Sequence, residues 1–142
     1  MATARPRSEV EQEMREVLGL VPSFFERVPD AILDYEWTLF KRYELEDTAL
    51  TKKAKQLIGV AIHSETKCRY CSLFHTEVAR LFGATEEEIQ DAVHYAKHTV
   101  GWSTYLNGIR QDFDEFENEL KEIIDYVKNQ PRVPAGKIVA GV

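Results

Sequence analysis

Helical periodicity runs through nearly the whole chain, and no other feature of the sequence constrains the fold so strongly. Apolar residues recur at intervals of three and four in segments such as DAILDYEWTLFKRY and DFDEFENELKEIIDYVKN, which is the spacing of one face of a helix. No segment shows the strict alternation of polar and apolar residues that is typical of a half-buried strand. The sequence therefore predicts an all-α fold.

Capping boxes divide this pattern into separate helices. Ser8 with Glu11 indicates a capping box that opens one helix, and Thr85 with Glu88 indicates a second. Between them, the segment TALTKKAKQLIGVAIHSE is expected to be helical from about Thr48. The second half of that helix is apolar on nearly all sides, so we expect it to be buried.

The length of the chain, 142 residues, suits a single domain with a sizeable core. We expect one helical domain over residues 1–130, with a core motif at about 48–112, followed by a C-terminal tail at 131–142. The tail contains apolar residues such as Ile138 and Val139, whose exposure is unfavourable. We therefore expect the tail to dock on a neighbouring subunit.

The composition is that of an ordinary globular protein, and the net charge argues against nucleic acid as a partner. Hydrophobic residues make up 44% and charged residues 30% of the chain, and the formal net charge is -6. This acidic balance argues against nucleic-acid binding, because phosphate contacts need a basic surface. The apolar run LIGVAI is too short to span a membrane, and the N-terminus lacks the apolar segment of a secretory signal. We therefore expect a cytoplasmic protein with neither nucleic acid nor membrane as a partner.

Both cysteines of the chain lie in one short segment, SETKCRYCSLFH. Cys68 and Cys71 are three residues apart, and His75 follows four residues later. On a helix over CRYCSLFHTEVARLF these side chains share one face, and Glu65 extends that face if the helix begins early enough. The helix dipole favours a thiolate at the N-terminus, and an imidazole one turn away can exchange protons with it. A close cysteine pair in the cytoplasm is more often catalytic or metal-binding than structural, which makes this segment the candidate site.

Other interpretations of the cysteines and histidines stay open. Cys68 and Cys71 would also pack as small hydrophobic residues in a core. A zinc site would need His63 or His98 as a further ligand, and the chain has no second C-x-x-C. His94 and His98 share a helical face and could ligate a metal, but they lack the intervening glutamate of the zinc-protease pattern. We predict neither a metal nor a cofactor.

The segment ETKCRYCSLFHTEVARLFGATEEEIQDAV resembles the core of the carboxymuconolactone decarboxylase/AhpD-like superfamily. The similarity consists of E-x-x-C-x-x-C-x-x-x-H, an amphipathic helix, a glycine and the restart T-E-E-E-I, and the helical pattern extends it over roughly residues 20–115. The resemblance implies an all-α, single-domain helical bundle that assembles into dimers, trimers or hexamers. Carried over by position, Cys68 and Cys71 match the redox pair and His75 matches the proton-relay histidine.

Departures from the superfamily pattern affect how the relay is assigned. The best-known members have a histidine directly before the second cysteine, where this chain has Tyr70. They also have a relay glutamate about a dozen residues before the first cysteine, near the position of Gln56. Many other relatives have an acid at the position of Glu65. We therefore assign support of the His75 relay to Glu65, and we treat Tyr70 and His63 as auxiliary residues.

Members that carry the cysteine pair are thiol-dependent peroxidases, or thiol–disulfide adaptors that serve a peroxiredoxin. The resemblance therefore implies an enzyme that reduces a small hydroperoxide with the dithiol of Cys68 and Cys71. A lipoyl or thioredoxin-like dithiol would reset the pair, without a bound cofactor. The sequence leaves open which cysteine meets the peroxide. The alternatives are a thiol–disulfide reductase without peroxidase activity, a lyase acting on a small lactone or keto acid, and a non-enzymatic oligomeric module that senses oxidation.

Overall fold

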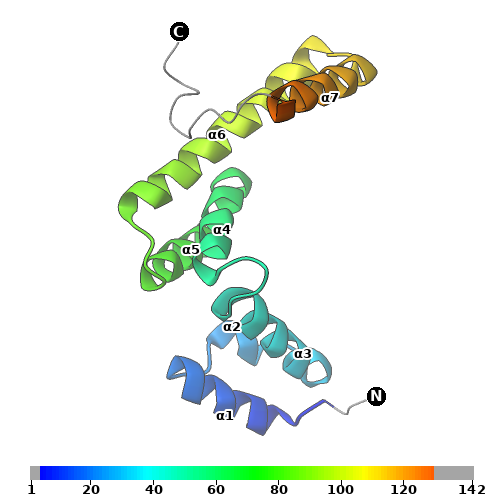
Figure 1. Ribbon diagram of the computed structural model, residues 1–142. Helices are drawn as coiled ribbons and strands as arrows, with labels where there is room; N and C mark the ends of the chain where they lie inside the picture. The colour runs from blue at the N-terminus through cyan, green and yellow to red at the C-terminus, as the bar shows by residue number, and fades with distance from the viewer. Residues whose placement is uncertain (1–3, 130–142) are drawn as a thin grey trace. The chain divides into compact units, whose positions relative to one another are not determined.

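The computed structural model describes residues 4–129, and this part of the chain consists of helices joined by short turns (Figure 1). No strand occurs among these residues, so the all-α prediction is confirmed. The elements in chain order are α1 (Arg7–Leu18), α2 (Ser23–Glu26), α3 (Asp30–Phe40), the π-helical turn η1 (Lys41–Leu45), α4 (Lys52–Thr66), α5 (Arg69–Leu81), α6 (Glu86–Ile109) and α7 (Phe113–Asn129). The chain divides into one compact unit that ends at His98 and a second that begins at Thr99, so α6 contributes to both.

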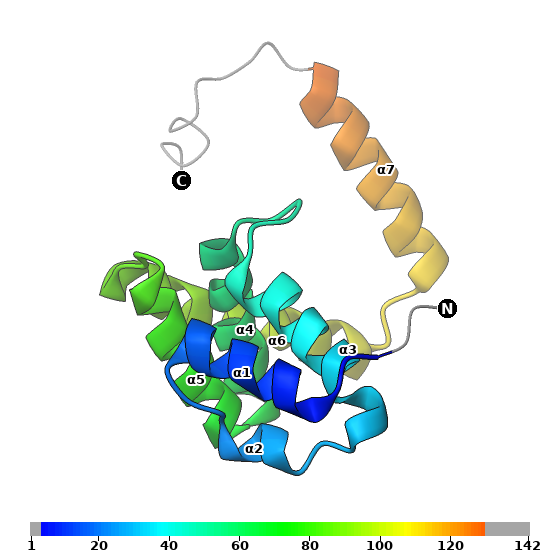
Figure 2. The ribbon, with the colours of Figure 1, turned by 90° about the horizontal axis from the view of Figure 1, so that it is seen from below.

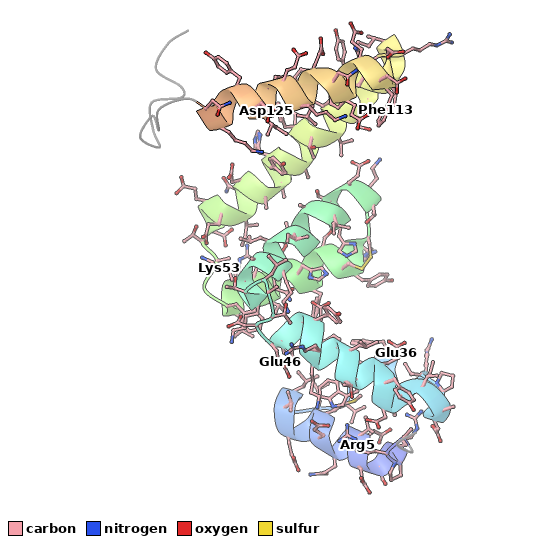
Figure 3. The ribbon with its side chains drawn as sticks, turned by 45° about the vertical axis from the view of Figure 1, so that its right-hand side comes forward. Arg5, Glu36, Glu46, Lys53, Phe113 and Asp125 are labelled. Atoms are coloured by element: carbon pink, nitrogen blue, oxygen red, sulfur yellow. A yellow bond between two sulfur atoms is a disulfide. The ribbon has the colours of Figure 1, made fainter. Side chains whose placement is uncertain are left out.

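The first unit begins with three helices around an aromatic core, in which α1 and α3 lie side by side (Figures 1 and 2). All three helices contribute buried side chains to this core: Val10, Met14, Phe25, Leu33 and Trp37. The Trp37 indole N–H donates a 2.9 Å hydrogen bond to Glu13, and Lys41 pairs with the same carboxylate. The hydrogen bond from Lys41 is the largest cause that lowers the pKa of Glu13 to about 2. Arg5, labelled in Figure 3, links α1 to α3, because it forms a 2.9 Å ion pair with Glu13 and donates hydrogen bonds of 2.9 and 2.8 Å to Asp34.

Helices α4 and α5 form a second layer of this unit and carry the cysteine segment. Their buried contact is made by Val60 of α4, Ala79 of α5 and Ile89 of α6. On the other side, the ring of Phe74 on α5 lies 5.8 Å from the ring of Phe40 at the end of α3. The helix pair therefore contacts both α6 and the end of α3.

The second unit, as far as residue 129, has no buried side chain of its own. Helix α7 runs from Phe113 past Asp125 (Figure 3) and is amphipathic. Its apolar stripe is exposed: Phe116, Leu120, Ile123, Ile124 and Val127. Within the described range, none of the helices combines the length and apolar character that a membrane crossing requires. The predicted tail at 131–142, and the docking predicted for it, lie outside the described residues.

The two predicted capping boxes have different outcomes. At the start of α6 the backbone N–H of Glu88 donates to Oγ1 of Thr85 at 3.1 Å, and the backbone N–H of Thr85 donates to Oε2 of Glu88 at 2.8 Å. This box is therefore confirmed. The box at Ser8 is wrong, because α1 already begins at Arg7 and has no side-chain cap. Arg7 instead holds Glu11 in an ion pair of 3.2 Å.

Helix α4 begins later than predicted and buries less of its surface. Thr51, rather than Thr48, precedes its first turn, and the Thr51 hydroxyl accepts a hydrogen bond from the backbone of that turn. Val60 is buried, but Ile58 is 46% exposed and Ile62 is 51% exposed. The expected burial on nearly all sides is therefore wrong within the described chain, because one face of α4 packs on α5 while another is left uncovered.

Candidate functional site

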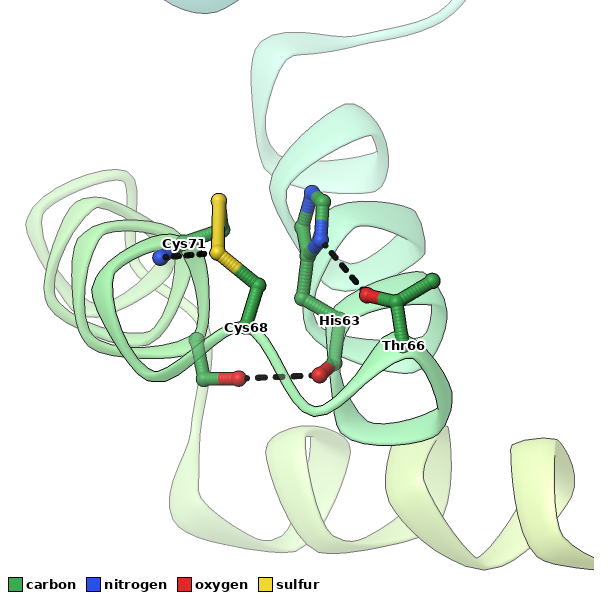
Figure 4. The surroundings of a disulfide bond; sticks show 5 residues. His63, Thr66, Cys68 and Cys71 are labelled. Carbon is green, nitrogen blue, oxygen red and sulfur yellow. Dashed lines mark hydrogen bonds between the residues drawn. A yellow bond between two sulfur atoms is a disulfide. The ribbon is translucent and has the colours of Figure 1, made fainter.

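The cysteine pair lies at the turn that joins α4 to α5. Helix α4 ends at Thr66, Lys67 adopts a left-handed conformation with φ 58°, and Cys68 becomes the N-cap residue of α5. Cys68 and Cys71 form a disulfide, with their Cα atoms 5.4 Å apart. The backbone N–H of Cys71 donates a 3.3 Å hydrogen bond to Sγ of Cys68, in the place where a cap hydroxyl or carboxylate usually accepts (Figure 4). The same N–H group can stabilise a thiolate at Cys68 once the disulfide is reduced.

His63 stands on the last turn of α4 and faces this pair. A ring nitrogen of His63 and the Sγ atoms of Cys68 and Cys71 all lie within 4.8 Å of one another. Nδ1 of the same ring lies 3.2 Å from the Thr66 hydroxyl (Figure 4). The hydroxyl of Ser72 donates a 3.1 Å hydrogen bond to the backbone carbonyl of His63, which ties α5 to α4 at this point. The residue that the sequence ranked as auxiliary is thus the histidine beside the sulfurs.

His75 lies one turn along α5 and packs directly on α4. Its ring is stacked on the ring of His63, with centroids 5.0 Å apart and planes inclined by 7°. A Cβ atom at Gly59 would lie only 2.5 Å from Cγ of His75, so the glycine creates the space that the ring occupies. The close approach of the two helices at Gly59 therefore determines where the imidazole sits.

A buried amide holds the other edge of the His75 ring. Gln56 is fully buried, and its Nε2 donates 3.0 Å hydrogen bonds to the backbone carbonyl and to Oε2 of Glu44. These two hydrogen bonds fix the orientation of the Gln56 amide. Its Oε1 therefore faces Nδ1 of His75 at 2.7 Å. Oε1 can only accept a hydrogen bond, so this network assigns the proton to Nδ1 and leaves the lone pair on Nε2.

The surroundings of His75 keep its ring neutral at neutral pH. Burial is the largest influence and lowers the pKa of His75 below its usual 6.5. The carboxylate of Glu44, 3.9 Å from Nδ1, acts in the opposite direction, while the neighbouring His63 lowers the pKa further. A neutral imidazole with a free Nε2 is the form that can accept a proton.

Two residues named from the sequence lie away from this network. Glu65 belongs to α4 rather than α5, its side chain is exposed, and it forms no hydrogen bond or ion pair with any residue from 4 to 129. The left-handed turn at Lys67 is the reason, because it ends the helix that would have aligned Glu65 with the cysteines. Tyr70 is 78% exposed, with the guanidinium of Arg69 lying over its ring at 5.5 Å. Roles for Glu65 and Tyr70 stay predictions.

A separate groove with a volume of about 730 Å³ runs between α4 and the first half of α6. Apolar side chains of α4, including Ile58 and Ile62, line one wall. The opposite wall carries polar groups of α6, including Asp91, His94 and His98. The groove includes neither cysteine.

Comparison with known proteins gives the family of the chain. The model of the carboxymuconolactone decarboxylase family matches residues 26–111. "Uncharacterized protein 4 in cox locus" of Paracoccus denitrificans is 35% identical over 77 residues, which cover 54% of this chain and 69% of that protein. The crystal structure of the alkylhydroperoxidase AhpD core from Rhodospirillum rubrum superposes with a TM-score of 0.64 at 22% identity, covering 81% of this chain and 96% of that one.

At that identity the solved structure establishes the fold alone, and it is the all-α fold that the sequence predicted. The family model establishes membership of the family, since it matches more than half of the chain. The resemblance drawn from the cysteine segment is thereby confirmed. We conclude that the chain belongs to the carboxymuconolactone decarboxylase family and has the AhpD-like fold.

Proposed function

We propose that the protein is a thiol-dependent peroxidase that reduces a small hydroperoxide with Cys68 and Cys71. One observation carries this proposal: the cysteine pair lies at the N-terminus of α5, with His63 beside the sulfurs and a neutral His75 stacked on it. Membership of a family that includes enzymes supports an enzymatic role. The structural neighbour from Rhodospirillum rubrum is itself named an alkylhydroperoxidase.

The proposed cycle moves two electrons from the dithiol to the peroxide. The thiolate of Cys68 attacks one peroxide oxygen and breaks the O–O bond, which forms a sulfenic acid and releases an alcohol that takes up a proton. The thiol of Cys71 then attacks this sulfur, forms the disulfide and releases water. Cys68 suits the first step because the Cys71 N–H and the helix dipole favour negative charge on its sulfur. An external lipoyl or thioredoxin-like dithiol restores the thiols by exchange and leaves as a disulfide.

We assign the proton transfers to the two stacked histidines. His63 is the ring nearest the sulfurs, and His75 is the neutral base whose Nε2 is free. Glu44, whose carboxylate lies 3.9 Å from His75, is better placed to support this relay than the exposed Glu65. Glu44 therefore takes the supporting role in our proposal.

A thiol–disulfide adaptor without peroxidase activity is the second candidate. One observation favours it: the side chains around the pair are open to solvent, with Tyr70 78% exposed and Leu73 66% exposed. An aromatic and an aliphatic side chain beside an accessible disulfide form a surface on which another protein can dock during exchange. The two candidates share the same dithiol and differ only in the oxidant.

We further propose that the protein is a homo-oligomer. The support comes from apolar surface that the described chain leaves uncovered, at Ile58 and Ile62 of α4 and along the stripe of α7. Contiguous apolar surface of this kind usually marks an interface between subunits. The number of subunits (two, three or six by the resemblance) and the cytoplasmic location stay predictions.

A peroxide-reduction assay coupled to a dithiol reductant tests the main proposal. Wild type is expected to consume an organic hydroperoxide, while the Cys68→Ser and Cys71→Ser variants lose turnover. His94→Gln serves as a control for the general effects of mutation and purification, and it should keep wild-type turnover, because His94 lies in the separate groove. Equal turnover by wild type and the Cys71→Ser variant would contradict the proposal. Exchange with a dithiol but no peroxide reduction would instead favour the adaptor, and lyase activity that survives loss of both cysteines would favour the decarboxylase alternative.

A further inference from the structure

We propose that the reduced protein binds one zinc ion per chain through Sγ of Cys68, Sγ of Cys71 and a ring nitrogen of His63. These three atoms lie within 4.8 Å of one another, and each side chain is only partly buried, so an ion can reach them. They come from two helices that the 3.1 Å hydrogen bond between Ser72 and the His63 carbonyl holds together. The fold therefore already brings the three residues together, and reduction of the disulfide would make both sulfurs available as ligands.

The donor chemistry selects the metal. Two thiolates and one imidazole form a set that suits Zn²⁺, with bonds of about 2.3 Å to sulfur and about 2.0 Å to nitrogen. Around a tetrahedral ion such ligand atoms lie roughly 3.5 to 3.8 Å apart. Once the disulfide is reduced, small side-chain rotations of Cys68, Cys71 and His63 can meet these distances. Three protein ligands leave a fourth position for water or for an incoming thiol.

Neighbouring groups already orient the ligands. Nδ1 of His63 is engaged by the Thr66 hydroxyl at 3.2 Å, which leaves Nε2 as the nitrogen available to the ion. The backbone N–H of Cys71 points at Sγ of Cys68 and would help to hold its negative charge. His75 is not part of the set, and its Nδ1 is already engaged by Oε1 of Gln56 at 2.7 Å.

Metal binding and disulfide formation compete for the same sulfurs. Binding of Zn²⁺ by two thiols releases two protons and moves no electrons, whereas disulfide formation removes two electrons from the same pair. The zinc form would thus be a resting state in which the dithiol is protected from oxidants. This regulatory consequence, unlike the metal site itself, rests on the proposed peroxidase function.

A spectroscopic titration tests the site directly. The full chain is reduced, freed of reductant without air, and titrated with Co²⁺, which reports its ligands by colour; Zn²⁺ is then added to displace it. We expect sulfur-to-cobalt charge-transfer bands and tetrahedral ligand-field bands that saturate at one ion per chain. The disulfide form should show none of these bands. Absence of thiolate bands in the reduced protein, or equal binding by the disulfide form, would overturn the site.

Variants separate this site from the histidine pair of α6. Cys68→Ser and Cys71→Ser should each remove the charge-transfer bands or halve them, and His63→Gln should weaken Co²⁺ binding by at least about tenfold. His94→Gln should leave the spectrum unchanged, since His94 lies in the separate groove. Far-ultraviolet circular dichroism checks that each variant is folded. Loss of the bands in His94→Gln, or unchanged affinity in folded His63→Gln, would overturn the assignment.

The two proposals fail in distinguishable ways. Peroxide turnover without thiolate–cobalt bands would remove the zinc site and leave the peroxidase intact. Thiolate–cobalt bands without turnover of any hydroperoxide would remove the peroxidase and leave the zinc site. If both hold, saturating Zn²⁺ should slow the oxidation of the dithiol by peroxide, and a chelator should restore the rate.

Discussion

The imidazole rings of His63 and His75 are stacked face to face, with centroids 5.0 Å apart and planes inclined by 7°. Positive charges on two rings this close would repel each other, and His63 accordingly contributes to the lowered pKa of His75. In the proposed peroxidase cycle a thiol loses a proton and an alcohol gains one, and we assign both transfers to this stacked pair.

Lowering the pH should destabilise the protein through His75. Burial is the main cause that lowers the pKa of His75 below 6.5, so the unfolded chain binds this proton more readily than the folded protein. The free energy of unfolding should therefore decrease as the pH falls from 6.5 towards the lower folded pKa. Urea unfolding followed across this range measures the slope. His75→Gln should flatten the slope and His94→Gln should keep it; a wild-type slope in His75→Gln would contradict the assignment.

Replacement of Gly59 by alanine should displace the His75 ring. The added Cβ would lie 2.5 Å from Cγ of that ring, and overpacking of this kind costs about 1–3 kcal/mol. Gly101→Ala is the matched control, because a Cβ at Gly101 meets nothing within 4 Å and alanine favours a helix by about 1 kcal/mol. Urea midpoints measure both changes. Equal effects of the two substitutions would show that Gly59 does not set the position of the ring.

The charge beside Nδ1 should control the titration of His75. Gln56→Glu places a carboxylate where Oε1 now accepts from the ring, so the pKa of His75 should rise. Glu44→Gln removes the carboxylate 3.9 Å away and should lower the pKa of His75 further. Titration of the ring signals by nuclear magnetic resonance measures both shifts. Shifts in the same direction for the two variants would rule out the network described for this edge of the ring.

The capping box of α6 should contribute measurably to stability. Thr85→Ala removes the hydroxyl that accepts from the Glu88 backbone at 3.1 Å and should cost about 1 kcal/mol. Ser8→Ala should change the free energy of unfolding by less than about 0.5 kcal/mol, because Ser8 lies on the exposed surface of α1 and caps nothing. Thermal or urea unfolding of both variants gives the comparison. A cost at Ser8 as large as that at Thr85 would contradict the helix start at Arg7.

Local spacing was enough to predict that the two cysteines lie together at the start of a helix. Cys68, Cys71 and His75 are related by intervals of three and four within one helix, and such intervals can be read from the sequence. The alignment of Glu65 failed because it depended on where that helix begins. The left-handed Lys67 ends α4 first, and a non-glycine residue in that conformation gives no reliable sequence signal.

The remaining members of the network could not be predicted from local spacing. His63, Gln56 and Glu44 come from α4 and η1, and they meet His75 only through tertiary packing. The sequence places Gln56 near the position of the superfamily's relay glutamate, but its hydrogen bonds to Glu44 depend on tertiary packing. The carboxylate of Glu44 is presented by a π-helical turn, which has no sequence pattern comparable to helical periodicity.

The disulfide encloses only two residues, and its N-terminal sulfur caps the helix to which the other belongs. Opening so small a ring frees very little chain entropy, and the Cys71 N–H keeps an acceptor in either oxidation state. The helices therefore need not refold when the disulfide is reduced or formed again. In the proposed peroxidase cycle, the chemical change would then be confined to the two sulfurs and would require no rearrangement of the helix that Cys68 caps.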